Sequence, residues 1–231
     1  MKRVYERVGV APDAEGWHVL LDDRPLRTPG RELLAMPTAG LAQAVAAEWA
    51  EQGEVVRPHA MPLMQLAATA IDRVRPARHA MVDAVARYAQ TDLVCYRADA
   101  PPALVARQHA AWQPLVDWAA LVHDAALRVV YGVMPEEQPA AALAALRTAV
   151  AAHDEWRLAA LSVATSGAGS LVIGLALLAG RIDAGQAWEA SQLDELFQVE
   201  QWGEDAEAAE RRAALRAELA ATERFARLAD R

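Results

Sequence analysis

The pattern of the sequence changes near residue 57, and this change constrains the fold more than any other feature. Before it, apolar and polar residues alternate, most clearly over Trp17–Leu21, where every second side chain shares one face of an extended chain. The acidic pair at 22–23 follows directly and is typical of a tight turn. We therefore expect a small antiparallel sheet, with strands over residues 4–8, 17–21 and 25–28.

One helix is expected before the change of pattern. Thr38 can serve as its N-cap, because a threonine hydroxyl accepts a backbone N–H that has no partner in the first turn. Apolar residues recur every four positions from Leu41 to Trp49, and Gly53 ends the pattern. This spacing predicts a helix over 39–52.

Beyond Pro58 the pattern is helical almost throughout, apart from a short extended piece at 127–131. The expected helices cover residues 62–74, 76–90, 101–124, 138–153, 155–166, 170–180, 183–202 and 204–229. The sequence thus predicts an α+β protein in which a small N-terminal antiparallel β subdomain is packed on a larger multihelical domain. The expected division is a β-rich part at 1–57 and a helical part at 58–231.

Composition narrows the class of function. The chain has 231 residues, of which 54% are hydrophobic, so it can bury a substantial core. Its formal charge is −8 with no visible basic stripe, which argues against nucleic-acid binding. Cys95 is the only cysteine, and the N-terminal residues resemble neither an export signal nor an import signal. We expect a cytoplasmic protein.

The uncharged stretch 158–180 leaves a membrane-anchored protein as an alternative, since it is long enough to cross a bilayer. However, its centre from Ala164 to Ser170 is polar and rich in glycine, which indicates a break between two shorter helices. A buried core helix over 171–178 is the preferred interpretation, and no membrane span is expected.

The search for catalytic and metal-binding motifs gives negative results. The six histidines never stand three or four residues apart, so no helix face offers paired imidazoles to a metal. The glycines at 167, 169 and 174 do not match a dinucleotide fingerprint, and no phosphate-binding loop is present. Nothing near Cys95 would activate its thiol. We therefore expect no catalytic residue, no metal and no cofactor.

An acidic window, residues 182–210, is the most unusual segment of the chain. It contains nine carboxylates and no lysine or arginine, so it carries more negative charge than the whole protein does. Large aromatic residues stand within it at Trp188, Phe197 and Trp202. A field of one sign steers a complementary partner, and aromatic side chains supply contact area. The window is interpreted as a docking surface for another protein.

Glu200 stands out within this window because helical spacing puts it on the same stripe as Leu193, Leu196 and Phe197. A carboxylate on an apolar stripe needs a partner. Two interpretations remain open: an internal salt bridge to one of the many arginines, or an arginine or amide on another protein.

Four separated blocks of the sequence, in order along the chain, resemble the ATP12 chaperones, which assist assembly of the F1 sector of ATP synthase. The first is GWHVLLDDRPLRTP at 16–29, and the second combines Glu48, Trp49 and Gln52 with Met61-Pro62, Leu66-Ala67 and 69–72. The third is TDLVCYRA at 91–98, and the fourth is DELFQVEQWGED at 194–205. The resemblance covers essentially the whole chain. It departs from the family pattern at Asp23, Met64 and Gln90, where family members often have Gly, Thr and Glu.

This resemblance implies a molecular chaperone that binds the unassembled F1 α subunit and shields its subunit interface until assembly. It implies no catalysis. Together with the charge argument, it makes five residues candidates for the partner-binding surface: Glu200, Trp202, Gly203, Glu204 and Asp205. The alternative is a small-molecule enzyme that uses the carboxylates near Trp202 for acid–base chemistry. A deep polar pocket would favour the enzyme, whereas an open and partly apolar surface would favour the chaperone.

Overall fold

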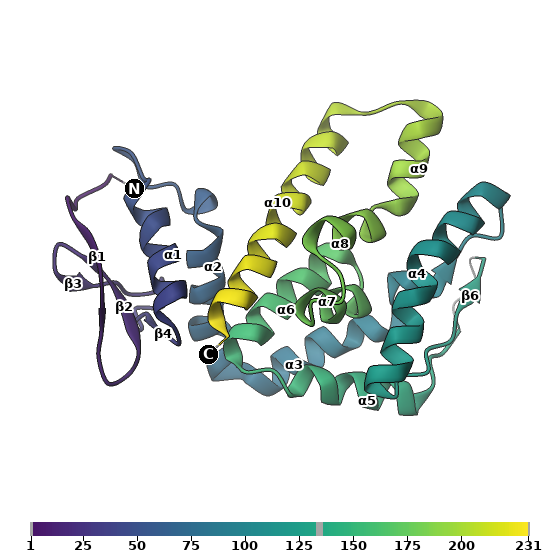
Figure 1. Cartoon of the computed structure of the whole chain (residues 1–231), viewed down its shortest axis with the longest axis horizontal. Helices are drawn as coiled ribbons and strands as arrows, with labels where there is room; N and C mark the ends of the chain where they lie inside the picture. Colours follow the sequence, from purple (N-terminus) through teal and green to yellow (C-terminus); the bar gives the residue numbers. More distant parts are fainter. Residues whose placement is uncertain (1, 133–135, 231) are drawn as a thin grey trace. The chain divides into compact units, whose positions relative to one another are not determined.

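The computed structural model describes residues 2–132 and 136–230. It contains a small N-terminal antiparallel sheet followed by helices, so the predicted α+β class is confirmed (Figure 1). Contacts divide the chain into two compact units. The sheet unit comprises Met1–Arg78, Asp154–Ala160 and Ala221–Arg231, and the helical unit comprises His79–His153 and Leu161–Ala220. The division between residues 57 and 58 stays a prediction. The compact units divide the chain elsewhere, because the sheet unit extends to Arg78 and includes two later segments.

The sheet is built around β2 (Trp17–Leu21), which is the strand that the alternating pattern predicts. It pairs antiparallel with β1 (Val8–Pro12) and, on its other side, with β3 (Arg24–Pro25) and β4 (Ala35–Met36). The predicted turn is confirmed, because Asp22 and Asp23 both have positive φ, at 48° and 66°, as a two-residue hairpin turn of the mirror-image type requires.

The first strand differs from the prediction, since it begins at Val8 rather than spanning 4–8. The reason is the carboxylate of Asp22, which accepts the backbone N–H groups of Glu6 and Arg7 at 3.0 and 2.8 Å. A side chain therefore occupies the donors that a longer strand would have used. Tyr5 is buried, and its hydroxyl donates to the carbonyl of Trp49 at 2.8 Å.

Helix α1 (Ala39–Ala50) packs on β1 and β2 through its apolar face. The predicted N-cap is confirmed, because the Thr38 hydroxyl accepts the backbone N–H of Leu41 at 3.1 Å. The helix ends at Ala50, with Glu51 as its C-cap, so it stops short of Gly53. Both Leu41 and Trp49 are buried, as their four-residue spacing predicts.

The segment predicted as one helix over 62–74 has two parts. After the short turn η1 (Pro58–Ala60) come α2 (Pro62–Thr69) and the π-helical turn η2 (Ala70–Val74). The N-terminus of α2 is capped from α1, because the Glu48 carboxylate accepts the backbone N–H groups of Leu63 and Met64, both at 2.8 Å. The helix predicted over 76–90 is likewise divided, into η3 (Arg75–Ala77), α3 (Arg78–Ala86) and η4 (Arg87–Thr91).

The helices from residue 102 onward correspond to the predicted ones except in one place. They are α4 (Pro102–His123), α5 (Ala140–Ala151), α6 (Glu155–Ala168), α7 (Leu171–Leu178), α8 (Ala184–Ser191), α9 (Leu193–Trp202) and α10 (Ala206–Ala229). The single helix predicted over 183–202 is wrong, because the chain breaks at Gln192, where φ is −107° and ψ is 14°. Asp183 and Gln186 form a capping box at the start of α8. A parallel pair of short strands, β5 (Tyr96–Arg97) and β6 (Val130–Tyr131), completes this part of the chain, after the turn η5 (Leu93–Cys95).

The stretch 158–180 is broken where the sequence predicts. Helix α6 ends at Ala168, Gly169 has a φ of +66°, and the Ser170 hydroxyl then caps α7 by accepting the backbone N–H of Ile173 at 3.0 Å. All eight residues of α7 are buried. None of the described helices is both long and apolar enough to cross a membrane.

Asp92 fixes the start of α7 from within the helical unit. Its fully buried carboxylate accepts the Ser170 hydroxyl at 2.5 Å and the backbone N–H of Val172 at 3.0 Å. Burial raises the pKa of this carboxyl group to about 6, although the hydrogen bonds oppose the rise. The core of the helical unit includes Trp112, Leu161 and Leu171, none of which reaches solvent.

Candidate functional site

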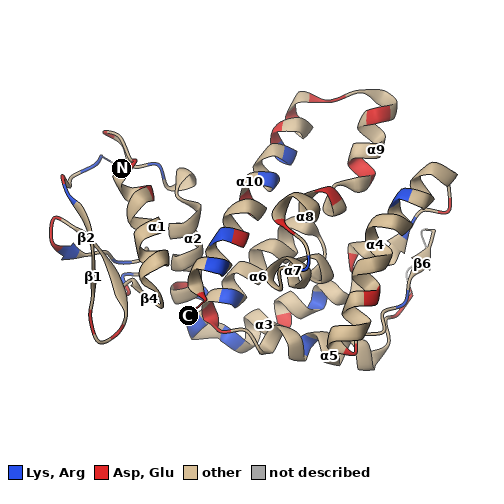
Figure 2. Cartoon of the chain, in the orientation of Figure 1, with Lys and Arg blue, Asp and Glu red and all other residues tan. Residues whose placement is uncertain are grey.

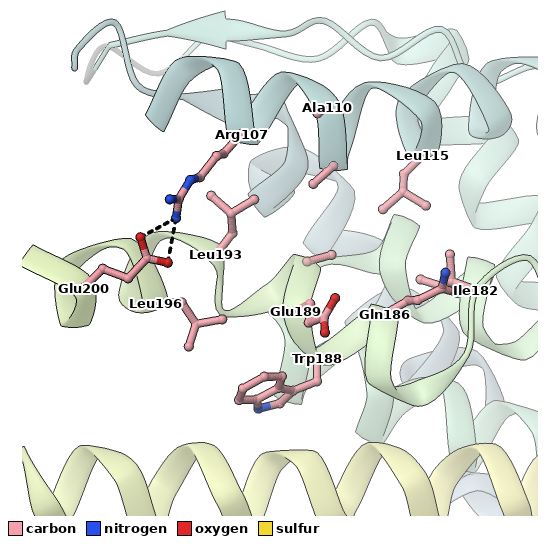
Figure 3. A pocket seen from close by; sticks show the side chains of 12 residues that line it. Arg107, Ala110, Leu115, Ile182, Gln186, Trp188, Glu189, Leu193, Leu196 and Glu200 are labelled. Carbon is pink, nitrogen blue, oxygen red and sulfur yellow. Dashed lines mark hydrogen bonds and ion pairs between the residues drawn. The ribbon is translucent and has the colours of Figure 1, made fainter. Parts of the chain in front are cut away.

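An apolar groove in the helical unit lies between α4 on one side and α8 and α9 on the other (Figure 3). Its volume is about 630 Å³. The wall from α4 is formed by Ala110, Ala111 and Leu115, and the opposite wall includes Leu193 and Leu196. Two carboxylates of the acidic window, Glu189 and Glu200, also line this groove.

Two hydrogen-bonded side chains of α4 hold the walls of the groove in place. The indole Nε1 of buried Trp112 donates to the carbonyl of Ala190 in α8 at 2.8 Å. Gln108 is also buried, and its amide nitrogen donates to Asp194 of α9 at 2.7 Å while its amide oxygen accepts the backbone N–H of Ala98 at 2.8 Å. The groove is therefore preformed, and Asp194 has a structural partner.

Glu200 closes one end of the groove through a salt bridge with Arg107 of α4 (Figure 3). The Nη1 atom of Arg107 lies 2.7 Å from each carboxylate oxygen, and its guanidinium carbon lies 5.3 Å from the centre of the Phe197 ring. Arg107 lowers the pKa of Glu200, and Glu200 raises the pKa of Arg107, mainly through this hydrogen bond. Of the two interpretations left open by the sequence, the structure shows the internal salt bridge.

Trp202 and Gly203 end α9. Trp202 is 79% exposed, which is unusual for the largest apolar side chain. Gly203 is the C-cap and has a φ of +89°, a conformation that favours glycine, and its N–H donates to the carbonyl of Val199 at 2.9 Å. The glycine thus stops the helix at the point where the tryptophan is displayed to solvent.

Glu204 and Asp205 lead into α10. The Glu204 carboxylate accepts from the Arg212 guanidinium at 2.5 Å, and the Asp205 carboxylate accepts the backbone N–H of Ala208 at 2.9 Å. Figure 2 shows acidic residues along α9 and the link to α10, with arginines following on α10 itself. Both carboxylates therefore have partners inside the chain.

The interpretation of the acidic window as a field of a single sign is corrected by these contacts. Arg107, Arg211 and Arg212 lie outside the window in sequence, yet they form salt bridges with Glu200, Glu207 and Glu204 respectively. Some carboxylates of the acidic window have no hydrogen-bond or ion-pair partner in the part of the chain that the structure describes. These are Glu189, Glu195 and Glu210.

The geometry of the described residues does not favour acid–base catalysis or metal binding. Cys95 is buried, and burial raises the pKa of its thiol to about 12, so the sulfur stays protonated at neutral pH. Among the described residues, no group of three or more histidine, cysteine, aspartate or glutamate side chains is placed to hold a metal ion. The five candidate residues are all exposed, and one of them, Glu200, lines the apolar groove.

Residues 2–120 of the chain match the family described as ATP12 chaperone protein, and this range covers more than half of the sequence. The chain belongs to the ATP12 chaperone family. It is also similar to two solved structures of Atp12 from Paracoccus denitrificans, one of them a point mutant. For each, the identity is 45%, the TM-score is 0.94, and the match covers 99% of this chain and 98% of the other.

A third structure, the Atu1473 protein from Agrobacterium tumefaciens, is 41% identical with a TM-score of 0.93. The match covers 98% of this chain and 85% of that one. Identity at this level over nearly the whole length confirms the family that the four sequence blocks suggested. The groove and the acidic surface are therefore features of a chaperone of this family.

Sequence reasoning for this ATP12 chaperone missed the α4 side of the groove. Arg107 stands among alanines and polar residues in a long helix, and no local pattern identifies it as the partner of a carboxylate 93 positions away. Gln108, which fixes Asp194, carries no signal either. Only Trp202 and Glu200 had a local signal, namely a large aromatic and a charge on an apolar stripe.

Proposed function

We propose that this ATP12 chaperone binds the unassembled F1 ATP synthase α subunit in the cytoplasm and covers its subunit interface until assembly. An isolated subunit exposes an apolar interface patch that promotes aggregation, and a reversible placeholder prevents this. The observation that carries the proposal is the preformed apolar groove, together with the exposed Trp202 that follows the groove residue Glu200 by two positions. A contact of this kind must be weaker than the final contact between subunits, so that assembly displaces the chaperone.

The proposed contact surface consists of Glu200, Trp202, Gly203, Glu204 and Asp205, together with the groove. Trp202 supplies most of the contact area, because tryptophan side chains dominate the energy of protein interfaces. Glu200 and Glu204 already have internal arginines, so they act at the rim, where a charge mainly influences the encounter rate. Gly203 and Asp205 act by setting the backbone that displays Trp202.

The alternative of an acid–base enzyme finds less support in the geometry. An enzyme of that class needs a carboxylate whose pKa is raised toward neutrality beside a pocket of converging polar groups. Here Arg107 lowers the pKa of Glu200, and Asp205 caps a helix. The adjoining groove is walled mainly by alanine, leucine and isoleucine side chains. An apolar side chain of another protein fits such walls better than a small polar metabolite does.

Binding of the purified α subunit to the full-length chaperone tests the proposal. We expect Trp202→Ala to weaken binding on the order of tenfold or more, because it removes an exposed anchor without disturbing the core. Leu121→Ala is the matched control, since Leu121 is 84% exposed on α4 but does not line the groove. Equal binding by wild type and Trp202→Ala, or no binding of the α subunit at all, would contradict the proposal.

A further inference from the structure

A second hollow lies within the sheet unit and takes no part in the site described above. Its volume is about 730 Å³. Its floor is apolar, and its rim carries two arginines. The floor residues are Trp49, Val56, Met61, Met64 and Ala68, and the rim residues that matter here are Arg27, Asp72 and Arg73.

Hydrogen bonds to two carboxylates preform this hollow. Glu48 caps α2 and so places Met64 on the floor. Asp72 of the π-helical turn accepts the Thr28 hydroxyl at 2.6 Å and the Gly30 backbone N–H at 2.9 Å, which ties the loop after β3 to the helix. A Cβ atom at Gly30 would lie 2.6 Å from a carboxylate oxygen of Asp72, so the loop can approach this closely only with glycine.

The rim is electropositive although the chain as a whole is acidic. Arg27 and Arg73 are both exposed, and neither forms an ion pair with any residue that the structure describes. The Arg27 guanidinium donates a hydrogen bond to the carbonyl of Arg31, at 2.8 Å. Asp72 is the only acid among the lining residues, and both of its oxygens already accept hydrogen bonds. Two cations are thus available to a partner.

The floor suits an apolar side chain of variable shape. Methionine side chains are flexible and polarisable, and they are common on surfaces that accept different partners. Met61 and Met64 lie beside Trp49, whose buried indole N–H has no acceptor within the described ranges. An unpaired buried donor is unfavourable, and a carbonyl or carboxylate oxygen brought in by a ligand would relieve it once the methionines shift.

We propose that this hollow is a second client-binding site, which takes an apolar side chain flanked by carboxylates on a polypeptide segment. The apolar side chain occupies the floor, and the carboxylates pair with Arg27 and Arg73. Complementary charge at the rim selects acidic segments and rejects basic ones. The proposal does not depend on which protein the chaperone binds, because it holds for any bound protein that has such a segment.

Two short peptides test the hollow directly on the full-length protein, without the α subunit. Acetyl-Glu-Leu-Phe-Glu-amide is the acidic probe, and acetyl-Lys-Leu-Phe-Lys-amide is its charge-reversed control. The chain has six methionines, so the methyl signals in a ¹³C-methyl-methionine NMR spectrum are few, and the conservative variant Met64→Leu assigns the one from Met64. The indole N–H signal of Trp49 is a second readout.

We expect the acidic peptide to shift the Met64 and Trp49 signals with a dissociation constant on the order of 1 mM, as is usual for a short flexible ligand. The basic peptide should leave them unchanged. The double variant Arg27→Glu with Arg73→Glu should weaken acidic-peptide binding by about tenfold or more. Arg24→Glu is the control, because Arg24 is also exposed in the sheet unit but does not line the hollow.

Three results of the peptide titrations would overturn the proposal. They are equal shifts from both peptides, no shift from either, and acidic-peptide binding that survives the double variant. Shifts of the Met64 signal that depend on protein concentration alone would also overturn it, since they would mean that a second copy of the chain occupies the hollow. Failure of the α-subunit experiment leaves this test untouched, so the two proposals can fail separately.

Discussion

The groove of the helical unit and the hollow of the sheet unit are both walled by apolar side chains, but they differ in how their charges are used. At the groove, Arg107 is paired with Glu200. At the hollow, the acid Asp72 is held by a hydroxyl and a backbone N–H, which leaves Arg27 and Arg73 without an acid. In the groove the one lining arginine is thus paired with a carboxylate and Glu189 remains without a partner among the described residues, whereas the rim of the hollow is cationic.

This difference shows that the charge of a binding surface depends on which partners the fold supplies, and less on composition. The acidic window loses much of its field because arginines from outside it lie beside its carboxylates. In the sheet unit, backbone N–H groups take the place of those arginines. Two surfaces of unlike sign on one chain would let the chaperone hold two chemically different parts of a client.

The largest effect is expected from removing Glu48, the carboxylate that caps α2 and shapes the floor of the hollow. Glu48→Ala leaves the N–H groups of Leu63 and Met64 without their acceptor in a buried place. We expect a loss of about 3 kcal/mol in the free energy of unfolding, because each unsatisfied buried donor is costly. Urea denaturation, monitored by circular dichroism, measures this loss in the free energy of unfolding.

Glu51→Ala is the matched control for this experiment. Glu51 is exposed near the end of the same helix, and we expect its removal to change stability by less than about 0.5 kcal/mol. If Glu48→Ala were as stable as this control, backbone capping by the sheet-unit acids would not shape the hollow. The comparison of the two depressions would then lose its physical basis.

The next largest effect on stability is expected at Asp92 of the helical unit. Its carboxylate accepts hydrogen bonds from N–H and hydroxyl groups, as that of Asp72 does in the sheet unit. Burial raises its pKa to about 6 in the folded chain from an ordinary value of 3.8. Between these values the folded protein binds a proton that the unfolded chain does not, so this group makes the protein more stable as pH falls from 7 to 4. The slope is at most about 1.4 kcal/mol per pH unit.

Asp92→Asn isolates this contribution, because the substitution removes the titrating group while other groups titrate as before. The difference in unfolding free energy between wild type and Asp92→Asn, measured by urea denaturation from pH 4 to pH 8, should favour wild type increasingly as pH falls through 6. A difference that is constant across this range would show that Asp92 does not take up a proton there.

Much of the fold was predictable because local chemistry determined it. The alternation over Trp17–Leu21, the positive-φ turn at Asp22 and Asp23, and the Thr38 cap each depend on residues within a few positions of one another. The predictions that were wrong concerned a contact between residues distant in sequence and a helix break that no local residue marks. Asp22 took the donors of the first strand from 15 and 16 positions away, and the break between α8 and α9 has no glycine or proline to mark it.

The candidate site was less predictable for the same reason. Trp202 could be found from its own character, but the partner of Glu200 lies on α4 and that of Glu204 lies on α10. The hollow of the sheet unit had no sequence signal at all, because its lining residues come from separated parts of the sequence, at 27–29, 49–56 and 58–73. Which charges remain free is a property of the folded chain, and a count of charges along the sequence does not give it.

The smallest effect on stability is expected at the Arg107–Glu200 pair. One substitution there would give the end of the groove the positive charge that the rim of the hollow has. Glu200→Lys leaves two cations at the end of the groove, as in the hollow of the sheet unit. The melting temperature should change little, because both side chains are about half exposed, at 48% and 49%. The acidic peptide should then shift the indole signal of Trp188, and α-subunit binding should weaken.

Glu195→Lys, on the same helix but outside the groove lining, is the control. A large fall in melting temperature for Glu200→Lys alone would make this carboxylate a structural residue, and Glu200 would leave the proposed binding surface.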